Sequence, residues 1–185
     1  WKDIIISGHV LAGKEKISKS KNNNPLAPEN LLKEYPADAI RYWTASGGLG
    51  HDITFSPTQL KIGQKLITKL WNAFRFISEH IQEKPATPSE FGVINEWLLD
   101  QASKTFSEYQ NYFEKNEFSL ALNAAETFFW HTFCDNYLEL IKDQLFNPDS
   151  YELLMSLVLP RLSYFLSSSL ALSFNLSSSI RTLAY

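Results

Sequence analysis

The sequence has one cysteine, Cys134, among its 185 residues. A single thiol cannot form an internal disulfide, which excludes the disulfide-rich secreted domains and fits a reducing, cytoplasmic environment. Methionine is equally scarce: Met155 stands alone and the chain begins with Trp1, so we expect a piece of a longer protein. The residues before the first short apolar run, Trp1-Lys2-Asp3, do not have the pattern of a secretory signal peptide.

Several chemical signatures are missing as well. The sequence contains neither the phosphate-binding Gly-x-x-x-x-Gly-Lys-Ser/Thr loop nor a glycine-rich dinucleotide fingerprint. His131 and Cys134 stand three residues apart beside Asp135, but a structural zinc site takes four ligands and no second His/Cys pair is visible in the sequence. We therefore predict no metal site and expect Cys134 to be a small buried packing residue.

A membrane span must be considered for one stretch of the sequence. The segment from Leu153 to Leu176 is long enough to cross a bilayer. Pro160 and Arg161 near its middle, together with many serines, favour instead a divergent last helix. We therefore expect no membrane partner.

Charge is divided unevenly along the chain. The formal net charge is −3, but residues 1–84 carry 12 Lys/Arg against 8 Asp/Glu, whereas residues 85–185 carry 5 against 12. A polyanion would be attracted to the first half and repelled by much of the second. The charge pattern therefore indicates which half would face a nucleic acid.

Helical periodicity dominates after the first fifty residues. Ser56, Pro57 and Gln59 form a capping box at the start of the best-marked helix. Within that helix, Trp71 and Phe74 are expected in the core. Long antiparallel helices joined by short loops make a bundle, so the fold class is mainly α, with a small α/β unit in front. The predicted elements are a buried strand at 3–10, a turn at 12–13, an extended link at 52–55, and helices at 28–35, 37–46, 56–82, 93–114, 117–145 and from about 150 to 160. The helix at 117–145 is expected to be capped by Asn116 and to carry Leu120, Ala124, Phe128, Thr132 and Asp135 on one side.

One face of the helix at 56–82 combines groups that suit an RNA loop. Lys69, Asn72 and Phe76 fall at positions i, i+3 and i+7, and Arg75 borders them. A lysine can bind phosphate, an amide can read base edges and an exposed aromatic ring can stack on a base. The same spacing also suits a core Phe76 and a merely solvated Asn72.

Residues 14–21 form a strongly basic segment, with four lysines among eight residues. Such a segment has little apolar surface and repels itself, so we expect a mobile surface loop unless an anion binds it. Lysine ammonium groups are compact charges that suit phosphate oxygens. A solvated run of charges is the plain alternative.

Within this segment, Lys16-Ile17-Ser18-Lys19-Ser20 resembles the Lys-Met-Ser-Lys-Ser signature of class I aminoacyl-tRNA synthetases. The motifs that follow resemble the valyl branch of that family and keep its order until the resemblance ends beyond Pro160. They are Tyr-Pro-Ala-Asp-Ala-Ile-Arg at 35–41, Gly-His-Asp-Ile-Thr-Phe-Ser at 50–56, Lys-Leu-Trp-Asn-Ala-Phe-Arg-Phe at 69–76 and Phe-Cys-Asp-Asn-Tyr-Leu-Glu-Leu-Ile-Lys at 133–142.

The resemblance implies two segments of one enzyme. Residues 1–55 would end the class I catalytic domain, and residues 56–185 would form most of a helical anticodon-binding domain. In the family, valine reacts with ATP, in the presence of Mg²⁺, and cations at the departing phosphates lower the barrier. The resemblance assigns that catalytic role to Lys16 and Lys19. It assigns ATP binding to Lys16, Ser18, Lys19 and Ser20, and binding of tRNA(Val) to Lys69, Asn72, Arg75 and Phe76.

The resemblance also implies a monomeric cytoplasmic parent. The rest of the active site, the valine pocket and the domain that would edit mischarged threonine are not in this sequence. We therefore expect the fragment alone to bind no cofactor tightly and to be inactive. Two alternatives stay open: a piece of an isoleucyl- or leucyl-tRNA synthetase, and a free-standing helical module that binds RNA or protein.

Overall fold

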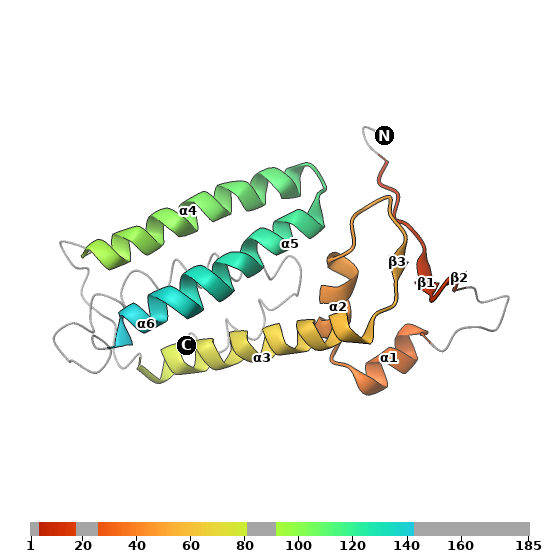
Figure 1. Ribbon diagram of the computed structural model, residues 1–185, viewed down its shortest axis with the longest axis horizontal. Helices are drawn as coiled ribbons and strands as arrows, with labels where there is room; N and C mark the ends of the chain where they lie inside the picture. Colours follow the sequence, from red (N-terminus) through yellow and green to blue (C-terminus); the bar gives the residue numbers. More distant parts are fainter. Residues whose placement is uncertain (1–3, 18–25, 81–91, 143–185) are drawn as a thin grey trace.

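A computed structural model describes residues 4–17, 26–80 and 92–142. Short strands and two short helices gather at one end of the molecule, and long helices extend away from them (Figure 1). The prediction of a mainly α protein with a small α/β part is confirmed.

The small sheet joins two distant parts of the sequence. Strand β1 (Val10–Ala12) lies between β2 (Glu15–Lys16), which is antiparallel to it, and β3 (Ile53–Thr54), which is parallel. The turn between β1 and β2 contains Gly13 at φ +67°, a conformation that glycine adopts without steric cost. The basic segment therefore begins as a hairpin, which corrects the prediction of a loop for Glu15 and Lys16; its residues 18–21 lie outside the described residues.

The strand predicted at 3–10 is displaced toward the C-terminus. Ile4, Ile5 and Ile6 are 70%, 53% and 71% exposed, so the prediction of a buried strand is wrong there. The reason is the length of the partner, because β3 pairs only with Val10 and Leu11. The predicted turn is also displaced by one residue, from 12–13 to 13–14.

Two short helices connect the sheet to the bundle. Helices α1 (Pro28–Glu34) and α2 (Ala37–Ala45) match their predicted positions. Helix α2 packs closely on α3 (Pro57–His80), and a Cβ atom added at Gly63 would lie 2.6 Å from the Tyr42 ring. A small core of Leu31, Trp43 and Leu60 lies beneath this junction.

The start of α3 follows the predicted capping chemistry. Ser56 Oγ accepts a hydrogen bond from the Gln59 backbone N–H at 3.3 Å, which satisfies one amide that lacks an intrahelical acceptor. The described helix ends at His80, and the predicted last residues 81–82 lie outside the described part.

Helices α4 (Val93–Glu114) and α5 (Phe118–Thr127) form an antiparallel hairpin. Asn116 was predicted to cap α5, but it has φ +61° and Glu117 is the N-cap instead. Asn116 belongs to the end of α4, because asparagine tolerates the left-handed conformation that terminates a helix. Its backbone N–H donates to Phe113 O at 3.0 Å.

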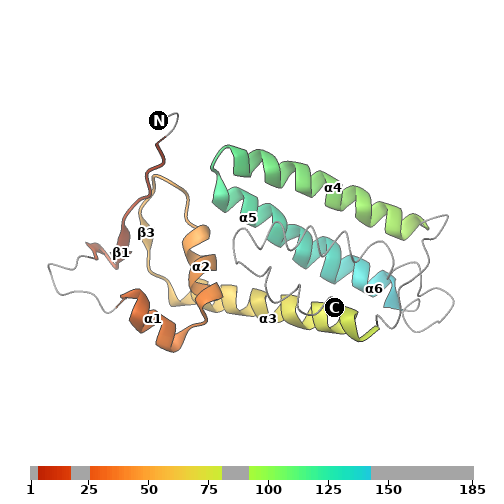
Figure 2. The same cartoon turned by 180° about the vertical axis from the view of Figure 1, so that it is seen from behind.

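The helix predicted at 117–145 is not a regular α-helix throughout. After α5 the chain continues as a π-helical segment (Phe128–Tyr137), with i→i+5 hydrogen bonding, and then as α6 (Leu138–Leu140). In both views this continuous rod lies between α4 and α3 (Figures 1 and 2). The main core forms along it, from Tyr42, Leu66, Ala73, Leu98, Leu122, Phe128, Phe129, Phe133, Cys134, Tyr137 and Ile141.

One prediction about a core residue is wrong, and one predicted helix side is buried only in part. Leu120 and Asp135, at the two ends of that side, are exposed, and the buried residues of α5 are instead Ala121, Leu122 and Ala125. Trp71 is 53% exposed rather than core, since the side of α3 that carries it faces away from the bundle. Phe74 is partly buried.

The predicted helix after residue 150 and the serine-rich and leucine-rich tail at 162–185 lie outside the described residues. Among the helices that the structure describes, none combines the length and the apolar character required to cross a membrane.

Candidate nucleic-acid interface

A groove lies between α3 and the π-helical segment. It has a volume of about 620 Å³ and brings together Lys69 and Asn72, two of the predicted RNA-binding residues. Trp130 is the part of its wall that comes from the π-helical segment. The remaining lining residues follow one face of α3 toward its N-terminus: Lys61, Gln64, Lys65 and Thr68.

Lys69 and Trp130 contact each other across this groove. The Lys69 Nζ atom lies 5.7 Å from the centroid of the Trp130 ring, within the range of a cation–π interaction. Trp130 in turn packs edge-on against buried Phe129, with the ring centroids 6.0 Å apart. The aromatic ring is therefore held by the core while it lines the groove.

The groove has a strongly basic wall. Its lining contains three lysines and no Asp or Glu. In the part of the chain that the structure describes, none of these lysines forms an ion pair. Gln64 and Asn72 add exposed side-chain amides. The Thr68 hydroxyl donates to the backbone carbonyl oxygen of Gln64 at 2.9 Å.

The other two predicted RNA-binding residues lie outside the lining. Arg75 is exposed on α3, one turn beyond Asn72, and is not free, since it interacts with another residue of the protein. Phe76 is partly buried and packs against the main core, which agrees with the alternative interpretation of Phe76 as a core residue. The structure therefore brings Lys69 and Asn72 together and separates them from Phe76.

Sequence reasoning missed most of this lining. Lys61 and Lys65 lie eight and four residues before Lys69, so extending the predicted face toward the N-terminus would have found them. Trp130 carries no such signal, because it is remote in sequence and follows two phenylalanines that enter the core.

The possible metal ligands near Trp130 do not form a site. Cys134 is buried, as predicted, and its burial raises the pKa of its thiol to about 11. His131 Nδ1 lies 3.2 Å from Asp135 Oδ2, and both side chains are exposed. Among the described residues, no group of three or more His, Cys, Asp or Glu side chains is placed to hold a metal ion.

The predicted ATP-side residues are described only in part. Lys16 ends β2, and its Nζ atom lies 3.2 Å from Nε2 of His9. The backbone N–H of His9 donates to Asp52 Oδ1 at 2.8 Å, which ties this hairpin to the segment before β3. Ser18, Lys19 and Ser20 lie outside the described residues.

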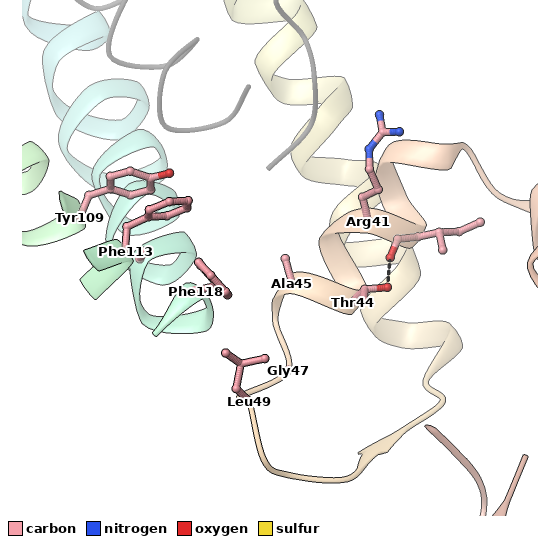
Figure 3. Close-up of a pocket in the computed structure, with 10 residues that line it drawn as sticks. Arg41, Thr44, Ala45, Gly47, Leu49, Tyr109, Phe113 and Phe118 are labelled. Atoms are coloured by element: carbon pink, nitrogen blue, oxygen red, sulfur yellow. Dashed lines mark hydrogen bonds between the residues drawn. The ribbon is translucent and has the colours of Figure 1, made fainter. Parts of the chain in front are cut away.

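A second hollow, of about 500 Å³, lies where α2 meets the tip of the α4–α5 hairpin. Figure 3 shows the rings of Tyr109, Phe113 and Phe118 on one side and Thr44 on the other. Most of this wall is apolar, and its Arg41 pairs with Asp38. The one cation among the described residues that line this hollow is therefore already paired with a carboxylate, unlike the lysines of the α3 groove.

Residues 95–172 match the family model of the anticodon-binding domain of tRNA ligases. This match includes the α4–α5 hairpin and the π-helical segment, so the class that this part of the chain defines is the anticodon-binding domain of a tRNA ligase.

Individual relatives narrow this class. The valine–tRNA ligase of Ehrlichia canis (strain Jake) is 44% identical over 149 residues, which cover 79% of this chain and 18% of the relative. Those of Haloarcula marismortui and Rickettsia felis are 40% identical over 147 residues and 36% identical over 164 residues, which cover 78% and 81% of this chain and 16% and 19% of the relatives. The chain belongs to the valyl-tRNA synthetase family, and it spans less than a fifth of the length of these relatives.

Proposed function

We propose that the chain is the part of a valine–tRNA ligase that holds tRNA(Val) by its anticodon loop and supplies the ATP-side signature loop. The observation that carries this proposal is the α3 groove, in which Lys69 and Asn72 lie beside two further lysines and an aromatic ring. In the parent enzyme, valine, ATP with Mg²⁺ and tRNA(Val) are the substrates. We also propose that the parent is a cytoplasmic monomer.

The chemistry of the groove supports an RNA ligand. Phosphate groups supply most of the electrostatic attraction between proteins and nucleic acids, and clustered lysines outside ion pairs are the groups that meet them. Asn72 and Gln64 have the donors and acceptors that hydrogen-bond to base edges. Such edges are accessible in a single-stranded loop, where the bases are unstacked.

The β1–β2 hairpin supports the ATP-side role. We propose that Lys16 and Lys19 stabilise the charge that develops on the phosphates as pyrophosphate leaves, and that Ser18 and Ser20 shape the loop around ATP. The contact between Lys16 Nζ and His9 Nε2 at 3.2 Å would hold the first of these lysines at the base of the loop.

Binding of tRNA tests the first part of the proposal. Full-length protein should bind tRNA(Val) more tightly than the same tRNA with a mutated anticodon. Lys69→Ala should weaken binding and lower the salt slope of the affinity by about 0.7, the contribution of one phosphate in a single strand. Lys115→Ala is the charge-matched control, because Lys115 is exposed at the end of α4 and outside the groove. Equal affinities for wild type and Lys69→Ala would remove Lys69 from the interface.

Pyrophosphate exchange tests the division of labour. The 185-residue chain alone should show no valine-dependent exchange, since the valine pocket is not in its sequence. In full-length protein, Lys19→Ala should lower the exchange rate much more than it weakens ATP binding, because the proposed contact strengthens in the transition state. Equal losses in rate and in ATP affinity would contradict a transition-state role.

A further inference from the structure

We infer that Trp130 is an RNA-recognition residue of the α3 groove, where its indole stacks on an unpaired base of the bound loop and positions Lys69 for a phosphate. The inference rests on the proposed function of the groove and adds a residue on a second element. It makes the interface a composite of α3 and the π-helical segment.

The position of Trp130 carries the inference. The ring is partly buried, lines the groove, and has Lys69 Nζ 5.7 Å from its centroid. Its contact with Phe129, at 6.0 Å and an interplanar angle of 61°, fixes the ring through the core. A ring whose orientation is set before binding loses little freedom when a base stacks on it.

The surroundings of the indole favour RNA over an acidic peptide. Lys61 and Lys65 are exposed on the same wall, at the i and i+4 positions of one helical face. Asn72 and Gln64 line the same groove and offer exposed amides. An acidic peptide would use the cations, but only a nucleotide uses a phosphate-binding cation, a base-reading amide and a stacking ring together.

Single-stranded RNA is the ligand class that this arrangement takes. Base–aromatic stacking requires a base outside a helix, since the faces of paired bases are covered by their neighbours. Stacking tolerates any base, so Trp130 would add affinity more than sequence preference. The amides, rather than the indole, would then discriminate among bases.

The test uses full-length protein and a stem–loop oligonucleotide that carries the valine anticodon loop. Trp130→Leu should weaken its binding by about tenfold, in the range expected for the loss of one stacked base. Trp130→Phe keeps an aromatic ring that can pack against Phe129 and stack on a base, so its affinity for the stem–loop should stay within about threefold of wild type. Binding should also change the tryptophan fluorescence of wild type, and this signal should be largely lost in Trp130→Phe, which separates stacking from a purely structural role.

A double-mutant cycle tests the positioning of Lys69. The combined loss in Lys69→Ala/Trp130→Leu should be smaller than the product of the single losses, since each variant already disrupts the shared contact. Thermal unfolding and circular dichroism of each variant check that the fold is retained.

The outcomes separate this inference from the proposed function. If Lys69→Ala weakens stem–loop binding while Trp130→Leu and Trp130→Phe bind like wild type, the role of Trp130 is refuted and the function of the groove stands. If neither wild type nor variants bind the stem–loop, both fail. Direct binding of polyglutamate that depends on Trp130, without stem–loop binding, would overturn the RNA assignment in favour of an acidic protein partner.

Discussion

The two lysines at the N-terminal end of the groove should account for a measurable share of the salt dependence of tRNA binding. Lys61 and Lys65 are exposed and lie one helical turn apart, so each can reach a different phosphate. For single-stranded RNA, each neutralised phosphate contributes about −0.7 to the slope of log K against log salt. Replacing both lysines by glutamine should therefore reduce the slope by about 1.4. Between about 50 and 200 mM salt, wild type should lose about sevenfold more affinity than the double variant.

Fluorescence anisotropy of labelled tRNA(Val) over a salt series gives both slopes. The matched control is Lys104→Gln/Lys115→Gln, which removes the same charge from α4 and its C-cap; Lys104 pairs with Asp100 at 2.7 Å. The control should keep the slope of wild type, since neither lysine lines the groove. If the Lys61/Lys65 variant and wild type have the same slope, the groove does not contact phosphates and the electrostatic reasoning is wrong.

Three further predictions concern the core. Tyr137→Phe leaves the buried amide oxygen of Asn95 without the hydroxyl that donates to it at 2.9 Å, and should cost about 1–3 kcal/mol of stability in thermal unfolding; an unchanged midpoint would mean that the pair is solvated. Gly63→Ala places a methyl group against the Tyr42 ring and should cost about 1–3 kcal/mol, measured by denaturant unfolding, whereas a neutral effect would show that α2 can shift. Cys134 should resist alkylation at pH 8, because its thiol is buried and has a pKa of about 11. The protonated thiol contributes fully to stability below pH 9.0, its ordinary pKa, and this contribution is lost as the pH rises toward 11. Unfolding measured over a pH series should show this loss in wild type and not in a Cys134→Ala variant.

Local chemistry explains which elements could be predicted from the sequence. The start of α3 depends on Ser56, Pro57 and Gln59, which act within one turn, and the structure has the predicted cap. The α4 boundaries were predicted equally well, because the segment is bounded by Gly92 and a turn at Asn116. Sheet pairing is different, since β1 and β3 are about forty residues apart and no local signal fixes their register.

The side of a helix that the bundle covers was harder to predict than the position of the helix in the sequence. Helical spacing shows that Lys69 and Asn72 share a side of α3, but it does not show which side the bundle covers. Trp71 was assigned to the core because it lies off the face that carries Lys69 and Asn72, and it is exposed. Trp130 was missed for the complementary reason: its place in the groove depends on the path of the π-helical segment, and that departure from the α-helical period has no signature in the sequence.

Tyr42 connects the part of the chain with the small sheet to the helical bundle. Its ring packs against Gly63 of α3, and its hydroxyl donates to Glu126 Oε2 of α5 at 2.9 Å. Burial, together with this carboxylate, raises the pKa of the phenol, so the hydroxyl keeps its proton and the bond persists across the physiological range. Helices α2, α3 and α5 therefore meet at the Tyr42 side chain. Under the proposed function, the sheet end lies toward ATP and the groove holds the RNA loop, so a firm junction between them would matter, because a displacement of about 1 Å at the reacting atoms lowers the rate about 100-fold.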